Sequence, residues 1–88
     1  MLNILLDGRR FTSKEASHRY LKKKLGRYRY LGFNLDALHD ALTSLPACCL
    51  RFRHVRALRK NGDGYGLRLF QVFVDAAAEH PGIRLLLH

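Results

Sequence analysis

Acidic side chains are scarce in this sequence of 88 residues: seven Asp and Glu stand against sixteen Lys and Arg, giving a formal net charge of +9. The electrostatic field of so positive a chain does not attract basic partners. It favours acidic ones instead, such as nucleic acid or an anionic membrane surface. This inference concerns association and not the fold.

Long apolar runs are also missing. None approaches the roughly 20 residues that a membrane-spanning helix needs, so we expect no membrane partner. The opening "MLNILLDG" lacks the basic region and the long apolar region of a secretory signal. We therefore expect a cytoplasmic protein.

Cysteine is limited to two neighbours, Cys48 and Cys49. Adjacent residues in a strand point to opposite faces, so a disulfide between them would be strained. We expect reduced thiols, one or both packed in the core. Linkers, repeats and low-complexity segments are absent, and 48% apolar composition suffices for one core. The sequence predicts a single domain over residues 1–88, monomeric when free.

Local patterns near the start of the chain predict a strand and a helix. The apolar run at 3–6 ends at Asp7, which is typical of a strand followed by a turn. Thr12, with Glu15 three residues later, predicts a capping box. The helix that it opens would cover "KEASHRYLKKKL" and end at Gly26.

A second helix is predicted after Asn34, a favourable N-cap, where leucines recur at helical spacing at Leu35, Leu38 and Leu42. The apolar "ACCLRF" then predicts a strand, and "HVRALRK" a short helix. A longer helix over 65–80 would turn inward Leu69, Phe70, Phe73, Ala76 and Ala77, before "IRLLL" forms a last strand.

Strands that alternate with helical crossovers pair in parallel. The predicted fold class is therefore α/β, with one layer of three-stranded parallel sheet packed against about four helices.

Four of the seven acids occur as two pairs at helical spacing, Asp36 with Asp40 and Asp75 with Glu79. At about 100° per residue, Asp36 and Asp40 lie about 40° apart on their helix, away from its leucines. Asp36 is favoured in the first turn by the helix dipole, but like charges four residues apart repel. The alternative interpretation of each pair is a solvated helix face with no binding role. This alternative is better supported for Asp75 and Glu79 than for Asp36 and Asp40.

The stretch "YLGFNLDALHDALT" resembles the signature of the barstar family of ribonuclease inhibitors, an aromatic–x–Gly–x–Asn–Leu–Asp–Ala–Leu–x–Asp–x–Leu pattern. "LFQVFVDAAAEHPGIRLLL" is similar to the last helix and strand of that family. The resemblance implies a barstar-like fold without catalytic activity or cofactor. It also implies an intracellular inhibitor, or an immunity protein against a nuclease toxin, that blocks a ribonuclease active site in a one-to-one complex.

The resemblance also implies a set of partner-binding residues. Asp40 stands where the family's anchor carboxylate replaces a substrate phosphate, and Asp36 where a second carboxylate meets the enzyme's basic residues. The other positions are the loop residues Tyr30, Gly32 and Asn34, the flanking His39 and Thr43, and the peripheral acids Asp75 and Glu79.

This chain departs from the family's usual pattern at three contact positions, Phe33, His39 and Leu45. It departs further in charge, since inhibitors of this family are typically acidic and this chain carries +9. These differences imply a target with an unusual surface, acidic outside its catalytic cleft.

The alternative function is a basic nucleic-acid-binding module on the same fold. Arg27, Tyr28, Arg29 and Tyr30 interleave cations with aromatic rings, as single-strand binders do. Further cations for phosphate contact would come from Lys22, Lys23, Lys24, Arg51, Arg53, Arg56, Arg59 and Lys60. The alternative interpretation is that these cations only form a solvated face of the protein, with Tyr20 or Tyr28 partly in the core.

An enzyme is disfavoured because the paired carboxylates are expected to face solvent, without a desolvating pocket to shift their pKa values. "NGDGYG" has neither P-loop nor Rossmann spacing. The histidines lack metal-ligand spacing and are expected at the surface; they are His18, His39, His54, His80 and His88. We therefore expect no metal and no cofactor.

Overall fold

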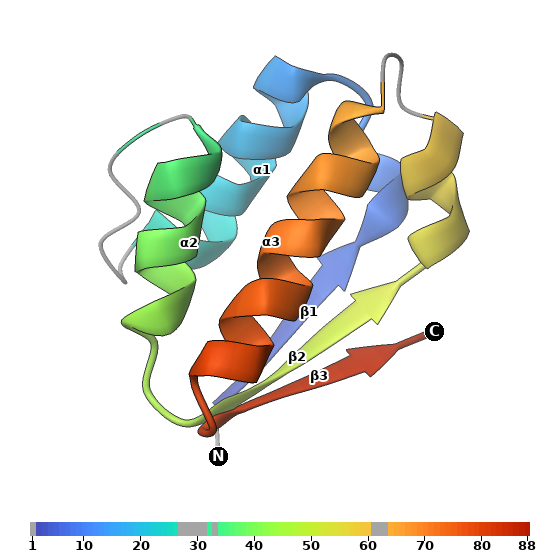
Figure 1. Cartoon of the computed structure of the whole chain (residues 1–88). Helices are drawn as coiled ribbons and strands as arrows, with labels where there is room; N and C mark the ends of the chain where they lie inside the picture. Colours follow the sequence, from blue (N-terminus) through green and yellow to red (C-terminus); the bar gives the residue numbers. More distant parts are fainter. Residues whose placement is uncertain (1, 27–31, 33, 61–63) are drawn as a thin grey trace.

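Three strands form one parallel sheet in this computed structural model, which describes residues 2–26, 32, 34–60 and 64–88. The strands are β1 (Leu2–Asp7), β2 (Cys48–Arg53) and β3 (Ile83–Leu87), in the order β1-β2-β3 (Figure 1). In the shared register Leu6 is opposite Phe52, which is opposite Leu87. The α/β class and the parallel three-stranded sheet predicted from the sequence are confirmed.

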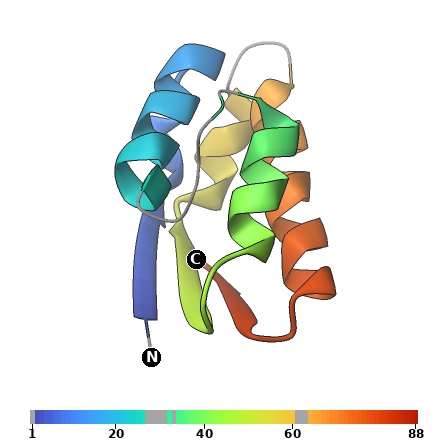
Figure 2. The same ribbon diagram turned by 90° about the vertical axis from the view of Figure 1, so that its left-hand side faces the viewer.

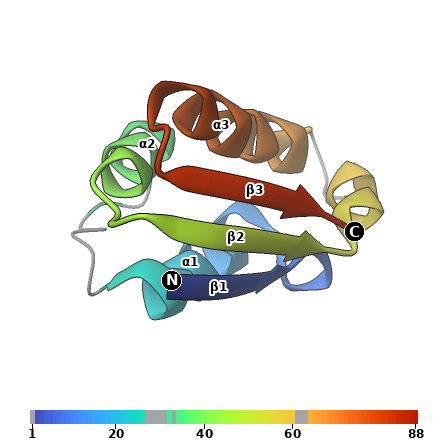
Figure 3. The ribbon, with the colours of Figure 1, turned by 90° about the horizontal axis from the view of Figure 1, so that it is seen from below.

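The three α-helices, α1 (Lys14–Leu25), α2 (Leu35–Thr43) and α3 (Tyr65–Glu79), all cover the same face of the sheet. Figure 3 shows the strands in front of the helices, with the other face of the sheet uncovered. Burial follows this arrangement: Leu50 and Phe52 of β2 are buried, whereas Arg51 between them is exposed. The sheet therefore shows the alternation of a half-covered sheet, although parallel sheets are mostly buried on both faces.

Phe52 lies at the centre of the core between the sheet and the helices. Its ring centroid lies 5.5 Å from that of Phe11 and 5.3 Å from that of Phe73, and all three side chains are fully buried. Burial of one such side chain stabilises the fold by roughly 1.5–3 kcal/mol. These contacts join β2, α3 and the segment before α1, which fixes the position of the helices on the sheet.

Helix α1 begins one residue later than its predicted capping box. The hydroxyl of Ser13 accepts a hydrogen bond from the Ala16 amide at 3.0 Å, so Ser13 and not Thr12 is the N-cap. Glu15 then falls at the second helical position and does not close a box with Thr12. Its carboxylate still lies in the first turn, where the helix dipole favours it.

Two short 3-10 helices follow the first two strands. The first, η1 (Gly8–Arg10), follows β1, and the second, η3 (Val55–Lys60), follows β2 where a short helix was expected. Because β1 and β2 are parallel, both 3-10 helices lie at the carboxyl edge of the sheet, and they contact each other there.

Helices α2 and α3 lead into β2 and β3, so their C-terminal ends lie at the opposite, amino edge of the sheet. The two helices pack side by side (Figure 2). In the part of the chain that the structure describes, none of the helices has the length and apolar character to cross a bilayer.

Candidate functional site

Helix α2 presents the first acidic pair on a firmly anchored helix. The Asn34 side-chain oxygen accepts a hydrogen bond from the Ala37 amide at 2.8 Å, which confirms the predicted N-cap. Leu38 and Leu42 are fully buried, so the opposite side of the helix faces solvent. Asp36 is exposed, and the Asp40 side chain is 86% exposed. Both carboxylates are therefore free to meet a partner.

The residues that flank the pair pack closely against α2. A Cβ added to Gly32 would lie 2.9 Å from the Ala37 side chain, so a larger residue here would push against the start of α2. The Thr43 hydroxyl donates to the His39 carbonyl oxygen at 2.9 Å and also lies 3.2 Å from the Asp40 carbonyl oxygen. Tyr30, also predicted at this site, lies outside the described residues.

His39 connects the two acidic helices. Its Nε2 atom lies 2.5 Å from a Glu79 carboxylate oxygen on α3, and its Nδ1 atom lies 4.0 Å from a carboxylate oxygen of Asp40. The imidazole is 36% exposed and Glu79 59% exposed, so the contact lies at the surface. The sequence placed His39 and Glu79 in the same site but gave no sign that they touch, because 40 residues separate them.

Asp75 completes the set on α3, one turn before Glu79. It is exposed, and its carboxylate accepts a hydrogen bond from the Gln71 side chain at 2.9 Å. The structure thus places Asp36, Asp40, Asp75 and Glu79 on adjacent helices that share one packed interface. We call these four residues and His39 the acidic edge.

His80 fixes the chain where both helices end. Its Nδ1 atom accepts a hydrogen bond from the Gly82 amide at 3.2 Å, so its Nε2 carries the proton and donates to the Leu45 carbonyl at 2.7 Å. The bond to Leu45 ties the end of α3 to the segment between α2 and β2. This holds the two acidic helices in a fixed relation.

Comparison with known proteins agrees with this geometry. The family model described as "Barstar (barnase inhibitor)" matches residues 1–87. The chain belongs to the barstar family. It is also similar to the Bacillus subtilis (strain 168) protein named "Putative ribonuclease inhibitor YrdF", with 51% identity over 43 residues. That match covers 49% of this chain and 47% of the relative, so it spans about half the length of each.

In this barstar-family chain the acidic edge has the chemistry of a binding surface. Its carboxylates are exposed, and carboxylates in water can accept hydrogen bonds from Arg, Lys or protonated His of a partner. Across the described ranges, no group of three or more His, Cys, Asp and Glu side chains is placed to hold a metal ion.

The two thiols are the first two residues of β2. Burial raises the pKa of Cys48, and the neighbouring Cys49 raises it further, which favours the thiol over the nucleophilic thiolate. Both cysteines are free and buried, as the sequence led us to expect.

His18 is the clearest error among the sequence predictions, because it was expected at the surface and is 1% exposed. Its Nε2 atom hydrogen-bonds the Tyr65 hydroxyl, which joins α1 to α3 inside the molecule. Burial lowers the pKa of His18, and the charge of Lys14 lowers it further. The available signal was helical spacing, because His18 lies three residues before Leu21 and seven before Leu25 on the apolar face of α1.

The basic residues of the alternative function are also placed by the structure. All the predicted phosphate-contacting cations are exposed: Lys22, Lys23 and Lys24 on α1, Arg51 and Arg53 on β2, and Arg56, Arg59 and Lys60 on η3. The interleaved Arg27, Tyr28, Arg29 and Tyr30 lie outside the described residues. Tyr20 is half-buried, as expected.

Proposed function

We propose that this protein inhibits a ribonuclease by inserting the acidic edge into the enzyme's active site. The observation that carries the proposal is the exposed pair Asp36 and Asp40 on a capped helix whose leucines are buried. Membership of the barstar family and similarity to a relative named as a ribonuclease inhibitor support it.

The physical basis is mimicry of substrate charge. A ribonuclease gathers Arg, Lys and His around the phosphates of RNA, and a carboxylate offers the same cations a negatively charged acceptor. Asp40 takes the place of a phosphate in this proposal, and Asp36 meets neighbouring basic residues. Because α2 fixes the spacing of the two charges before binding, little conformational entropy is lost on association.

The second helix widens the contact. Asp75 and Glu79 add ion pairs at the periphery, where exposed charges contribute little affinity each but set the orientation of the complex. Gly32, Asn34 and Thr43 lie beside the acidic pair of α2, and in this proposal Tyr30 is a further contact residue. The complex is one to one, and in the cell it protects the producer from its own nuclease or from a nuclease toxin.

Titration of microbial ribonucleases with the purified protein tests this function. We expect at least one enzyme to lose activity on an RNA substrate at a one-to-one ratio. A nucleotide monophosphate that occupies the enzyme's phosphate site should weaken the inhibition competitively. Inhibition that this nucleotide leaves unchanged would contradict binding in the active site.

A further inference from the structure

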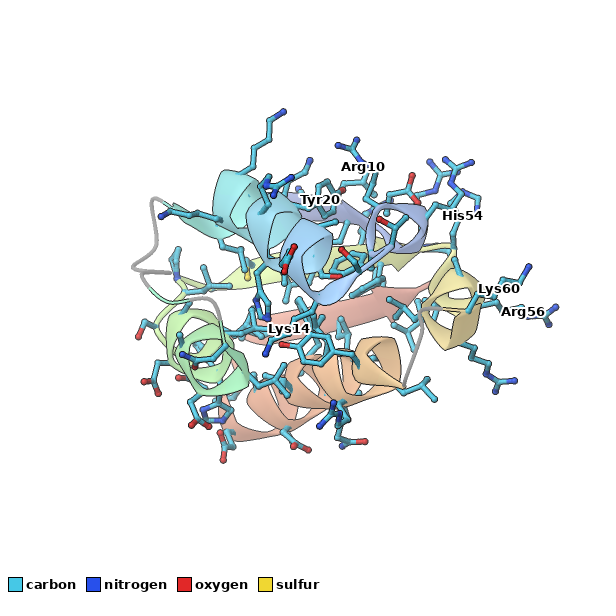
Figure 4. All side chains as sticks on the ribbon, turned by 90° about the horizontal axis from the view of Figure 1, so that it is seen from above. Arg10, Lys14, Tyr20, His54, Arg56 and Lys60 are labelled. Atoms are coloured by element: carbon cyan, nitrogen blue, oxygen red, sulfur yellow. The ribbon has the colours of Figure 1, made fainter. Side chains whose placement is uncertain are left out.

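The carboxyl edge of the sheet carries a hollow surrounded by positive side chains. Its volume is about 600 Å³, and the lining includes Arg9, Arg53, His54, Arg56, Lys60 and His88. In Figure 4 Arg56 and Lys60 point outward from η3, with His54 beside them. None of these residues belongs to the acidic edge.

A close approach of two backbones builds this hollow. A Cβ added to Gly8 would collide with the His54 carbonyl oxygen, so only glycine lets η1 lie this near the end of β2. His54 itself turns the chain into η3 with a φ of 55°, a conformation that non-glycine residues rarely adopt. Arg9 is thereby brought beside the cations of η3.

A second hollow of about 320 Å³ continues the positive surface onto α1. Its lining includes Arg9, Arg10, Arg19, Tyr20 and Lys23. Arg9 lines both hollows, so they form one continuous track from η3 across η1 to α1. The Arg10 guanidinium lies 5.0 Å from the centre of the Tyr20 ring, an attractive contact that orients this cation before any ligand arrives (Figure 4).

Among the described residues, most cations of the track form no ion pair with Asp or Glu. The carboxylate of Asp7 pairs with Arg9 at 2.9 Å, and the hydrogen bond from Arg9 lowers the pKa of Asp7 to about 2. No other ion pair with Asp or Glu occurs at the track within the ranges that the structure describes. The remaining cations, Arg10, Arg19, Lys23, Arg53, Arg56 and Lys60, are left to attract an anionic partner.

We propose that this track binds the phosphodiester backbone of single-stranded RNA. The described lining of the first hollow carries three Arg and one Lys; Lys is depleted in protein–protein interfaces, whereas dense positive charge is typical of nucleic-acid interfaces. Arginine forks match phosphate oxygens in geometry, and a flexible strand can follow a path that bends over three elements.

The RNA site is independent of the inhibitory site. The first hollow, with Arg56 and Lys60, lies at the carboxyl edge of the sheet, whereas Asp40 and Glu79 lie near the amino edge, one strand length or roughly 17 Å away. One molecule can therefore bind RNA at the carboxyl edge of the sheet while the acidic edge remains accessible to a ribonuclease.

Fluorescence anisotropy with a labelled 20-nucleotide single-stranded RNA of mixed sequence tests this site in the full chain. The affinity for RNA should fall steeply as the salt concentration rises. The double variant Arg56→Gln with Lys60→Gln should reduce the magnitude of the slope of log K against log salt by about 1.4. The matched control, Arg68→Gln with Arg84→Gln, removes the same charge from exposed residues that line neither hollow. It should keep the slope.

Asp40→Ala should leave RNA binding within about twofold of the wild type, which separates this site from the inhibitory one. If both double variants lost the same amount of RNA affinity while circular dichroism showed them to be folded, the binding would depend on net charge alone. That result would overturn the proposal. It would also be overturned if polyglutamate of equal charge displaced the RNA as well as unlabelled RNA does, or if no binding occurred at low salt.

Discussion

His39 and Glu79 touch across the two acidic helices, with 2.5 Å between the imidazole Nε2 and the carboxylate oxygen. The contact sets the separation of α2 and α3 at the surface where a ribonuclease would bind. Because both groups are partly exposed, water and salt screen the interaction.

A double-mutant cycle measures this contact. His39→Ala and Glu79→Ala should show a coupling of about 0.2–1 kcal/mol in the free energy of unfolding, the range for surface pairs. The control cycle of His39→Ala with Asp75→Ala should be additive, since Asp75 is bonded to Gln71 instead. Urea denaturation provides the measurement, and additivity in both cycles would contradict the contact.

His18 makes stability depend on pH. Burial lowers the pKa of His18 below the usual 6.5. As the pH falls, His18 is therefore protonated in the unfolded chain before it is protonated in the folded chain. The free energy of unfolding should be level above about pH 6.5 and decline below it, by at most about 1.4 kcal/mol per pH unit.

Chemical denaturation between pH 7.5 and pH 5 measures this decline. The decline should become smaller in His18→Gln and remain in His88→Gln, which changes an exposed histidine. Lys14→Gln should also reduce it, because the Lys14 charge contributes to the lowered pKa. Identical pH profiles for His18→Gln and the wild type would show that His18 is not the group responsible.

Substitution by alanine should have different effects on stability at Gly8 and at Gly26. Gly8→Ala places a Cβ against the His54 backbone and should destabilise the fold by about 1–3 kcal/mol. Gly26 has helical backbone angles, and among the described residues the nearest atom to an added Cβ is Cγ of Lys22 at 3.8 Å, so Gly26→Ala should be neutral or stabilise by up to about 1 kcal/mol. Thermal unfolding of both variants checks the difference, and equal stabilities would contradict the close approach.

The rate of association with a basic ribonuclease should rise with salt. The molecule measures 32 × 27 × 20 Å, so at physiological salt, where the Debye length is about 8 Å, the basic track is screened from the acidic edge. At 0.01 M salt the Debye length is about 30 Å and the enzyme meets the whole +9 charge. Stopped-flow mixing measures the rate, and a rate that falls as salt rises would show net attraction.

The sequence predicted the features that local patterns determine. The apolar runs and leucine spacing give the order of elements, and Asn34 caps α2 as predicted because an N-cap needs only the next three residues. The same rule failed at Thr12 and Ser13, adjacent hydroxyls of which only one can take the cap position. Contacts between distant residues, such as His39 with Glu79 and His18 with Tyr65, leave no local pattern.

Only part of the positive track was predicted, as the scattered cations Lys23, Arg53, Arg56 and Lys60, whereas Arg9, Arg10 and Arg19 were not named. Its continuity depends on Gly8 bringing η1 beside η3, and on parallel strands that end at the same edge. Neither relation can be derived from the spacing of Arg and Lys in the chain. The acidic pair on α2 was easier to predict, because its two members lie on one turn of one helix.

The inhibition constant of Asp40→Ala tests the central claim most directly, measured against a ribonuclease that the wild-type protein inhibits. The Asp40 side chain is 86% exposed and its described ion pair, with His39 at 4.0 Å, lies at the surface, so its loss should leave the fold intact. We expect inhibition to weaken by about 2 kcal/mol or more, about thirtyfold, as for a central anchor at an interface, a range for which barstar complexes are themselves reference cases. The control Glu15→Ala removes an exposed carboxylate on α1 and should change the constant less than twofold. An unchanged inhibition constant for Asp40→Ala would contradict the acidic edge as the inhibitory site.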